Sequence, residues 1–470
     1  MPRGPDKVRA TIIKAFEMVV QKFGGTSVAD PAAIRRLIEI VRTARGRDGR
    51  GPAVVVSAMS GVTDLLLGIA SAAGSGGGTA DALARIEQLR ERHLAAVREL
   101  AAANDHDALT TEINATLDQL AAVAQALTVL REVSPRTLDV IAAMGELLSS
   151  RIVAAALNAA GVASEWVDAR RAIVTSADHM RATPLTVETA RALRATVVAA
   201  LDAKRVPVLG GFVGATVDGH TTTLGRGGSD YSGALVGAGV GAREIQIWTD
   251  VDGMLTADPR VIKRPRLVPK LSFAEAAELA YFGAKVLHPS TILPAVERNI
   301  PVRILNSMRP DGSGTLITAE PSLDGTPLTG LASKGNVIVV DITSTRMLMA
   351  YGFLRRVFEV FERFSTAVDV VTTSEVSVSV TVDDPKAIPA ITEALSEFAE
   401  VSIERDMALL CAVGDRLRDE PKIAAQVVSV LEEVPLKMIS QAASRRNITV
   451  VLRQNDLAHA MERLHEEFFQ

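Results

Sequence analysis

The sequence predicts an α/β protein in two parts: a mostly parallel sheet between layers of helices, then two smaller units that mix strands and helices. Three observations support this prediction. From residue 18 to about 311, short β-branched runs alternate with long Ala- and Leu-rich segments of helical period. Beyond residue 330, the order strand, helix, strand, strand, helix occurs twice. The 470 residues are also too many for one ordinary hydrophobic core.

The first part should be built on short apolar strands that follow an N-terminal extension, residues 1–17, of irregular or helical character. Strands are expected at 18–23, 53–58, 206–213, 244–249 and 301–306. Long helical connections favour parallel pairing, and ligands of parallel sheets bind beyond the carboxyl ends of the strands. The loops rich in Gly, Ser and Thr should therefore hold the chemistry.

Composition also indicates where the domains divide. Stripes of Ala and Leu across residues 80–160 predict three long helices, which we interpret as an inserted helical subdomain. The stretch 309–326 is rich in Gly, Pro, Asp and Ser, which is typical of a linker. We expect one domain over 18–311, a linker over 312–326 and a second region over 327–470.

The second region is an internal repeat whose copies are not equivalent. The first copy covers about 335–405, whereas the second lacks a closing strand. An unpaired sheet edge is usually covered. Since the segment 327–334 could supply the missing strand, we expect the first repeat to be inserted in a second one made of 327–334 and 406–470.

Composition and charge exclude several classes of protein. Apolar residues make up 48% of the chain and charged residues 23%, with a net charge of −4 and no basic stripe, so nucleic acid is not an expected partner. The lone Cys411 cannot form an internal disulfide, which favours a reducing, cytoplasmic setting. No apolar run reaches the roughly 18 to 20 residues of a membrane span, so no membrane is expected.

The first candidate site follows the first expected strand. Lys22 precedes Gly24 and Gly25, and a helix should begin at Asp30-Pro31 because an acid before proline is a good start signal. The glycines would let the backbone approach an anion, and Lys22 would supply a mobile positive charge. The alternative is a tight turn with a solvated lysine.

The second candidate site is the run from Thr221 to Asp230, before the small-residue helix 231–241. So many hydroxyls and glycines cannot build a core, but they suit a cradle for phosphate or carboxylate. Arg226 could hold a carboxylate in a two-point fork. The alternative is a flexible loop in which Asp230 merely caps the helix.

Weaker signals come from the segments after residue 248. Arg260 and Lys285 would place more positive charge near a polyphosphate, although the turn at 249–253 is ordinary architecture. The run 237–242 fits a dinucleotide fingerprint, but it ends a helix and precedes a strand, the reverse of the required order. The sequence has no P-loop motif and no paired histidines that suit zinc.

Seven motifs in order resemble those of aspartate kinases, members of the amino acid kinase family. They are KFGGTSV (22–28), VVVSAMSGVTD (54–64), MGE (144–146), TTTLGRGGSDYS (221–232), TDVDG (249–253), TADPR (256–260) and FGAKVLHP (282–289). The tandem repeat resembles that family's pair of ferredoxin-like ACT domains. The resemblance implies a monofunctional enzyme with a three-layer α/β/α sandwich followed by two ACT domains.

The resemblance also implies roles by matching position. Lys22 and Asp230 would be catalytic. Glu146 would meet the ammonium of L-aspartate and Arg226 its α-carboxylate, and the neighbouring substrate residues would be Ser57, Thr63, Gly227, Gly228 and Ser229. The nucleotide side would comprise Lys22, Phe23, Gly24, Gly25, Thr249, Asp250, Leu255, Arg260, Lys285 and Val286. Leu255 departs from the tyrosine of many relatives, which puts the contact to the base in doubt.

The implied reaction also agrees with general chemistry. The side-chain carboxyl of aspartate ordinarily titrates with a pKa of about 3.9, so it is already ionised at neutral pH and no general base is needed. Two anions must instead be brought together by positive charge, amide donors and Mg²⁺. Nothing resembles a protein metal cage, so Mg²⁺ should arrive with ATP and water.

The first repeat resembles the effector region of lysine-responsive relatives. Asp369 would take the ammonium of lysine, the amides near Met347 and Gly352 its carboxylate, and Thr373 and Ser374 would close the pocket. The alternative is that Asp369 only begins a strand and the repeat only joins subunits. ACT repeats commonly pair across subunits, so the resemblance implies a homodimer or homotetramer.

Two rival functions remain open at this point. One is another amino acid kinase acting on glutamate, acetylglutamate or carbamate, although the pairing of Arg226 with Glu146 favours an α-amino acid. The other is a non-catalytic amino-acid sensor, which would be expected to lose Lys22 or Asp230. Both residues are present.

Overall fold

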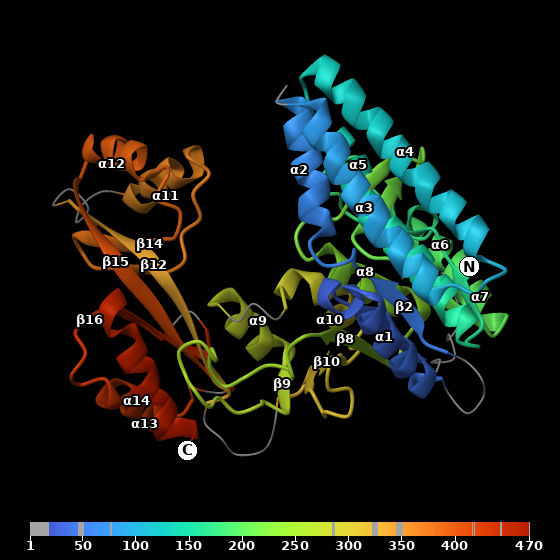
Figure 1. The fold of residues 1–470 in the computed structure, drawn as a ribbon. Coiled ribbons are helices and arrows are strands. Elements are labelled where there is room, and N and C mark those ends of the chain that lie inside the picture. The colour runs from blue at the N-terminus through green and yellow to red at the C-terminus, as the bar shows by residue number, and fades with distance from the viewer. Residues whose placement is uncertain are drawn as a thin grey trace, which may run out of the picture. The chain divides into compact units, whose positions relative to one another are not determined.

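The structure, a computed structural model, describes residues 18–45, 51–75, 78–283, 287–321, 328–344, 351–415, 417, 419–441 and 444–469. These residues belong to two compact units (Figure 1). The first unit holds the chain through Gly253 together with His288–Ala319, and the second holds Met254–Leu287 and Glu320–Gln470. The boundaries expected from the sequence place residues 254–287 in the first domain, and those boundaries stay a prediction.

The first unit is built on a mostly parallel sheet. Its strands lie in the order β3-β5-β2-β1-β8-β10-β11, and only β11 pairs antiparallel to its neighbour. Their bounds are β1 Val19–Phe23, β2 Ala53–Val56, β3 Ser164–Trp166, β5 Val206–Gly210, β8 Glu244–Thr249, β10 Val302–Asn306 and β11 Thr315–Thr318. The carboxyl ends of β1, β2, β5 and β8 therefore meet at one edge.

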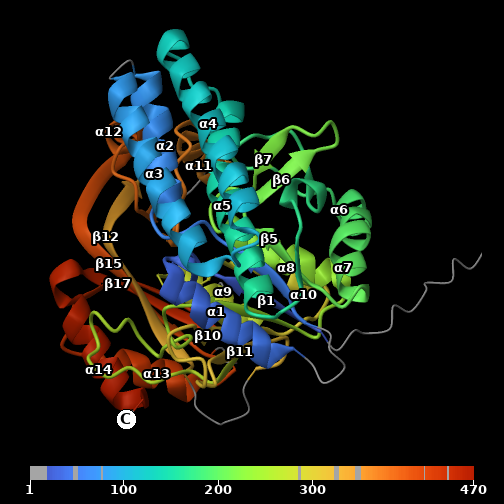
Figure 2. The same cartoon turned by 45° about the vertical axis from the view of Figure 1, so that its right-hand side comes forward.

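Helices cover both faces of this sheet. Phe23 of β1 shares a core with α1 (Pro31–Ala44), α2 (Val62–Gly74) and α5 (Pro135–Ala159). The neighbouring Lys22 must face the other way, because successive side chains of a strand alternate, and there α8 (Gly228–Val240) approaches it. α3 (Thr79–Leu100) and α4 (His106–Leu130) extend the first core beside α2 (Figure 2).

The expected strand 206–213 is wrong in one respect, because the chain breaks it in two. β5 ends at Gly210, and β6 (Val213–Thr216) lies in a separate three-stranded sheet with β4 (Val174–Thr175) and β7 (Thr221–Thr223). Phe212 between them has a φ of 64°. A side chain at Gly211 would meet Ser229 at 2.7 Å, so α8 packs against this turn. The remaining helices of the unit are α6 Thr186–Leu193, α7 Ala199–Asp202 and α10 Leu293–Glu297.

The structure corrects two further expectations. β11 lies inside the stretch expected to be a linker, 312–326, and pairs with β10. α4 and α5 are long and apolar enough to cross a membrane by length and composition, contrary to the expectation that no apolar run would be. In α5, however, 83% of that apolar stretch is buried, and the helix shares one core with α1 and α2, so it is a core helix of the first unit. α4 buries one stripe, including Ile113 and Leu117, in the same core, so its apolar character is also explained by packing.

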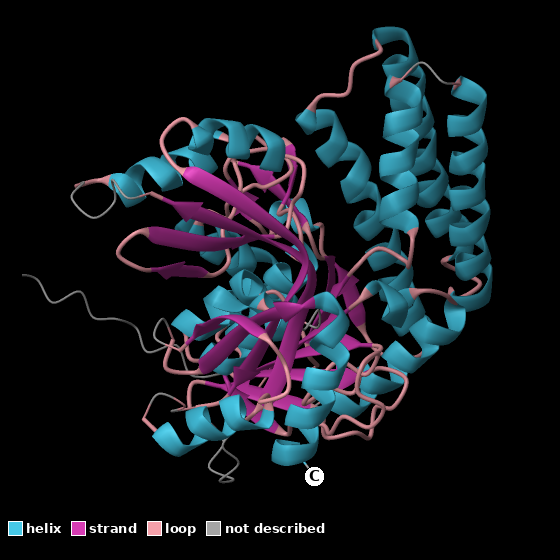
Figure 3. Ribbon diagram, turned by 90° about the vertical axis from the view of Figure 1, so that its left-hand side faces the viewer, coloured by secondary structure: helices cyan, strands magenta, loops and turns pink. Residues whose placement is uncertain are grey.

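The second unit holds a six-stranded sheet in the order β13-β14-β12-β15-β17-β16. Figure 3 shows the strands in magenta and the helices in cyan. The bounds are β12 Gly330–Thr343, β13 Val371–Thr373, β14 Ser377–Val382, β15 Glu400–Val413, β16 Leu436–Ser440 and β17 Asn447–Arg453. The helices are α9 Phe273–Tyr281, α11 Phe353–Arg363, α12 Ile388–Ser396, α13 Pro421–Val430 and α14 Leu457–Phe469, and a short strand β9 spans Lys270–Ser272.

One long strand serves both halves of this sheet. Residues 330–334 of β12 pair with 409–413 of β15, whereas residues 338–343 also pair with β14. α11 and α12 pack on the half that contains β14, and α13 and α14 on the half that contains β17. This is the pairing that an inserted repeat requires, and the division into two ACT domains stays a prediction.

Candidate active site

A cavity of about 650 Å³ opens in the first unit, beyond the carboxyl ends of β1, β2 and β8. Its walls come from the loops after these strands, the starts of α2 and α8, and the middle of α5. The expected site residues that line it are Gly24, Gly25, Ser57, Thr63, Glu146, Arg226, Gly227, Gly228, Ser229, Thr249 and Asp250. The structure thus brings together segments that lie up to about 226 residues apart in the sequence.

Lys22 and Asp230 form an ion pair beside this cavity. The Lys22 Nζ atom lies 2.6 Å from the Asp230 Oδ1 atom, and both side chains are largely buried. The pair forms because Lys22 faces α8, whose first turn carries Asp230. The helix comes close because it has glycine at position 233, where a side chain would press on Lys22 at 3.2 Å. A fixed cation therefore lies next to the loop of Gly24 and Gly25.

The N-termini of α2 and α8 reach the cavity without side-chain caps. Asp30 caps α1 and Ser134 caps α5, but Gly61 and Gly227 precede α2 and α8 and offer no such hydrogen bond. Free amides at a helix start, together with the helix dipole, attract anions. Gly227 has a φ of 72° and a side chain there would meet a Thr291 methyl at 2.7 Å, so this position needs glycine.

Glu146 is the most perturbed acid of the site. Its side chain is almost fully buried, and burial raises its pKa to about 8, although the Ala58 amide and the charge of Lys22 oppose the rise. Within the described part of the chain, its Oε2 atom has no hydrogen-bond partner. Gly210 makes this burial possible, because a side chain there would lie 2.9 Å from Glu146. Among the residues that the structure describes, no cation forms an ion pair with this carboxyl in the cavity wall.

The polar groups near Glu146 complete one end of the cavity. The Ser57 hydroxyl donates to the Ser229 hydroxyl at 3.0 Å. Arg226 is exposed and, across the described ranges, has no ion-pair partner. A small molecule with both an ammonium and a carboxylate could therefore find an acid and a guanidinium in the same cavity.

The expected nucleotide residues are distributed more widely. Phe23 is buried and stacks on Trp248, with ring centroids 6.1 Å apart, so only its backbone could meet a nucleotide. Leu255 and Arg260 belong to the second unit, where the Arg260 guanidinium pairs with Asp258 at 2.5 Å. Lys285 and Val286 lie outside the described residues.

The expected effector residues that the structure describes lie in the second unit, and the acid among them is already paired. Asp369 is nearly buried and accepts hydrogen bonds from Lys334 Nζ at 2.9 Å and from the Tyr281 hydroxyl at 3.1 Å. Lys334 also pairs with Asp383 at 2.6 Å. The predicted acid therefore already has partners in its own chain.

The other effector candidates are placed only in part. Gly352 precedes α11 with a φ of 84°, Thr373 ends β13, and the Ser374 hydroxyl lies 2.7 Å from that of Ser377. Met347 lies outside the described residues. A pocket formed by all five residues stays a prediction.

Sequence reasoning missed several residues at the cavity. Met180, Phe212, Ser60, Gly61 and Asp64 also line it. A buried acid, Asp139, lies behind Met180 and was missed as well. Its signal was available, because Asp139 is a single acid in an apolar run of α5, seven residues before Glu146.

Comparison with known proteins agrees with this geometry. Residues 17–306 match the amino acid kinase family, and residues 410–468 match an ACT domain. The chain is 36% identical over 465 residues to chloroplastic aspartokinase 1 of Arabidopsis thaliana, covering 96% of this chain and 80% of that protein. It is 34% identical to lysine-sensitive aspartokinase 3 of Escherichia coli, covering 97% and 100%.

Solved structures give the same relationship. The crystal structure of E. coli aspartokinase III in complex with aspartate and ADP (R-state) has a TM-score of 0.81 and 34% identity, covering 97% of this chain and 100% of that one. A second structure of the E. coli enzyme, with lysine and aspartate (T-state), has the same TM-score at 33% identity, with the same coverage.

Proposed function

Because the chain belongs to the amino acid kinase family and, within it, to the aspartokinases, we propose that it transfers the γ-phosphoryl group of ATP to the β-carboxylate of L-aspartate. The product is 4-phospho-L-aspartate, the first intermediate toward lysine, threonine and methionine. The fold class and the activity implied by the sequence resemblance are confirmed.

One observation carries the assignment of the acceptor. Glu146 is a buried acid in the cavity wall, and its Oε2 atom has no partner among the described residues. Burying a charged group is unfavourable unless a counter-charge satisfies it. The α-ammonium of aspartate would supply that charge, while Arg226 holds the α-carboxylate in a fork. An N-acetylated acceptor has no ammonium to offer, which favours aspartate over acetylglutamate.

The residues around the phosphates lower the barrier by electrostatics. We propose that Lys22 neutralises the transferring phosphoryl group, and that Asp230 holds Lys22 in place through their 2.6 Å ion pair. The uncapped starts of α2 and α8 would donate amides to the phosphate and carboxylate oxygens. The attacking β-carboxylate needs no general base, since it is ionised at neutral pH.

Mg²⁺ would be held mainly by the nucleotide. Among the described residues, no group of three or more His, Cys, Asp or Glu side chains could hold a metal ion. This donor set suits a cation that stays bound to phosphate oxygens and water, as Mg²⁺ usually does at kinase sites. Mg²⁺ bound in this way reduces the repulsion between the two anionic substrates.

We also propose lysine as an allosteric inhibitor acting through the second unit. The support is the similarity to an enzyme that is crystallised with lysine and aspartate in a T-state, together with the largely buried acid Asp369 in the second unit. A homodimer or homotetramer joined by the ACT region, and a cytoplasmic location, are further parts of this proposal.

The test is an assay in which hydroxylamine traps the acyl phosphate formed from L-aspartate, L-glutamate or N-acetyl-L-glutamate with MgATP. Hydroxamate should form with aspartate and not with the other two acceptors. Hydroxamate formed only from glutamate or acetylglutamate would assign the enzyme to another branch of the family. No product from any acceptor, in a folded protein that binds ATP, would favour the sensor.

A further inference from the structure

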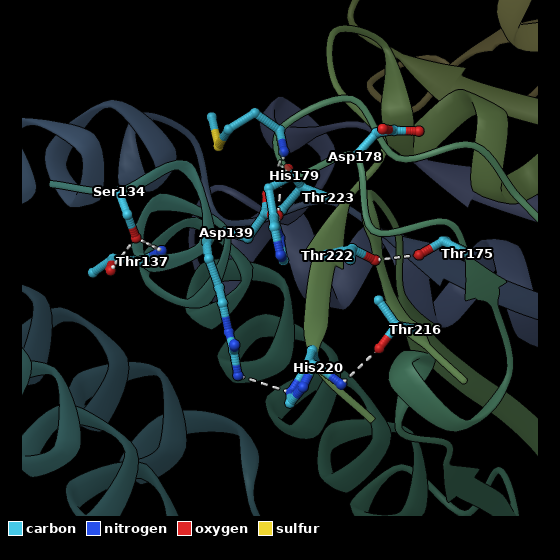
Figure 4. A network of polar contacts seen from close by, with 12 residues as sticks. Ser134, Thr137, Asp139, Thr175, Asp178, His179, Thr216, His220, Thr222 and Thr223 are labelled. Carbon is cyan, nitrogen blue, oxygen red and sulfur yellow. Dashed lines mark hydrogen bonds and ion pairs between the residues drawn. The ribbon is translucent and has the colours of Figure 1, made fainter. Parts of the chain in front are cut away.

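A buried polar cluster lies behind the cavity wall and has no role in the reaction described above. It is centred on Asp139 of α5, whose side chain is inaccessible to solvent. The Thr223 hydroxyl donates to Asp139 Oδ1 at 2.5 Å, and His179 Nδ1 lies 2.6 Å from Oδ2 (Figure 4). The Met180 amide donates to Oδ1 at 3.0 Å. One carboxylate thus joins three donors from two separate segments.

The two segments that contain these donors lead to the part of the cavity that would bind the amino-acid acceptor. Met180 lines the cavity itself, and Thr223 ends β7 three residues before Arg226. The Ala182 amide donates to the Thr223 carbonyl at 2.9 Å, and the Met180 carbonyl lies 3.1 Å from the position that a side chain would take at Gly225. The turn 177–182 therefore supports the backbone from which Arg226 projects.

The turn needs this support. Met180 has a φ of 69°, a left-handed conformation that is unfavourable for a residue other than glycine. Such a conformation persists only where the surroundings fix it. The hydrogen bonds from the Met180 amide to both carboxylate oxygens of Asp139 provide that constraint.

The same helix also places the acid that we assign to the acceptor ammonium. Asp139 and Glu146 are seven residues apart, which is two turns, so they share one face of α5 about 10 Å apart along its axis. A single rigid helix therefore sets both Glu146 and, through Asp139, the loop of Arg226. The distance between the two charged groups that would grip the acceptor depends on this helix.

We propose that Asp139 is a positioning residue for the amino-acid acceptor: it fixes the turn of His179 and Met180 against Thr223, and thereby holds Arg226 at the spacing from Glu146 that aspartate requires. This inference rests on the proposed function, because the acceptor must be an α-amino acid. Asp139 does not touch the substrate, so its loss should weaken acceptor binding and spare ATP.

The experiment compares Asp139→Asn with Thr222→Val. The substituted amide keeps the shape of the side chain but removes the charge that holds His179 and the Met180 amide. Thr222 is the matched control, because it is equally buried, precedes Thr223 in β7, and bonds Thr175 at 2.6 Å on the other side of the strand. Two readouts are needed: steady-state kinetics for both substrates, and hydrogen exchange of the amides of 177–182 and 224–228 in the free protein.

In Asp139→Asn, the KM for aspartate should rise at least about tenfold, because a small displacement of a group that positions the substrate can cost that much or more. The KM for ATP should stay unchanged. Exchange in both peptides should become faster. Thr222→Val should change neither. If Asp139→Asn does not fold, Thr223→Val, which removes one of the three donors, is judged by the same criteria.

Hydrogen exchange at the wild-type rate in both peptides of Asp139→Asn would overturn the inference. Faster exchange without a rise in the KM for aspartate, or with an equal rise for ATP, would overturn it too. A wild-type enzyme that does not phosphorylate aspartate would instead refute the proposed function, and the exchange comparison, made without substrate, would still decide whether Asp139 anchors the two segments.

Discussion

The two units each contain a buried acid near a lysine, and the two acids differ in one respect. In the first unit, Glu146 has an oxygen atom without a partner among the described residues, and burial raises its pKa to about 8. In the second unit, Asp369 is also nearly buried, but it accepts hydrogen bonds from Lys334 and Tyr281. One acid still needs a cation, whereas the other already has one.

Under the proposed function, this difference corresponds to two ways of recognising an amino acid. An unsatisfied buried acid gains most when a ligand brings the missing charge, so the first unit is prepared for a substrate. At Asp369 a ligand ammonium would have to replace Lys334. Only the difference in free energy between the ion pair with the ligand and the ion pair with Lys334 would then favour binding. Weak, adjustable binding of that kind suits an effector whose concentration must be sensed.

The lysines next to the two acids should differ most in their effect on turnover. Lys22→Met should lower kcat by about three orders of magnitude, because it removes a preorganised positive charge that stabilises the transition state. Lys334→Met should leave kcat unchanged in the absence of lysine, because Lys334 lies in the second unit and, among the described residues, forms ion pairs with Asp369 and Asp383 of that unit. Both variants should keep the wild-type far-ultraviolet circular dichroism. Comparable kcat values for the two variants would show that Lys22 is not a catalytic residue.

A second prediction concerns the guanidinium that would complete the acceptor site. Arg226→Lys keeps the charge but loses the two-point fork, so the KM for aspartate should rise about tenfold and that for ATP should not change. The matched control is Arg181→Lys, since Arg181 packs near Gly225 but does not line the cavity. If only the KM for ATP changes in Arg226→Lys, Arg226 acts on the nucleotide side.

The pH dependence of acceptor binding tests the role assigned to Glu146. Below its pKa of about 8 the free carboxyl is mostly neutral, and the ammonium of aspartate favours the ionised form. The KM for aspartate should therefore fall about fivefold between pH 7 and pH 8, with little change in the KM for ATP. Glu146→Gln should bind aspartate weakly and lose this dependence. An equal pH dependence in the variant would assign the titration to another group.

A further prediction concerns inhibition by lysine. Removing Lys334 would leave Asp369 without its ion pair. A partly exposed ion pair contributes about 1 kcal/mol, so Lys334→Met should lower the inhibitory lysine concentration about fivefold. Asp369→Asn should abolish inhibition. Titrations of lysine against initial rate decide both points. Unchanged inhibition in Asp369→Asn would show that the ammonium binds elsewhere.

Much of the fold and of the site could be predicted because the relevant signals are local. β8 coincides with the expected strand 244–249, and Asp30-Pro31 starts α1 as its cap signal indicated. Glycine and hydroxyl residues after strands mark the loops that line the cavity. Periodicity and short motifs carry this information without reference to the rest of the chain.

The remaining features depend on contacts between distant segments. The close approach of Ser229 to Gly211, just after β5 ends, joins segments 18 residues apart. The pairing of Asp369 with Lys334 and Tyr281 joins a loop, a strand and a helix that are far apart in sequence. The same holds for Asp139, whose partners lie some 40 and 84 residues away. Tertiary packing settled these points, and the sequence signals were compatible with other outcomes.

The most direct test of the contrast between the two acids compares L-aspartate with N-acetyl-L-aspartate as acceptors for the wild type and for Glu146→Gln. Acetylation removes the ammonium and leaves the β-carboxylate that receives the phosphoryl group. The wild type should form hydroxamate from aspartate and essentially none from the acetylated acceptor, and the ratio of the two kcat/KM values should fall about tenfold or more in Glu146→Gln, because the unpaired acid is gone. An unchanged ratio in that variant would contradict the claim that Glu146 awaits the ammonium of the substrate.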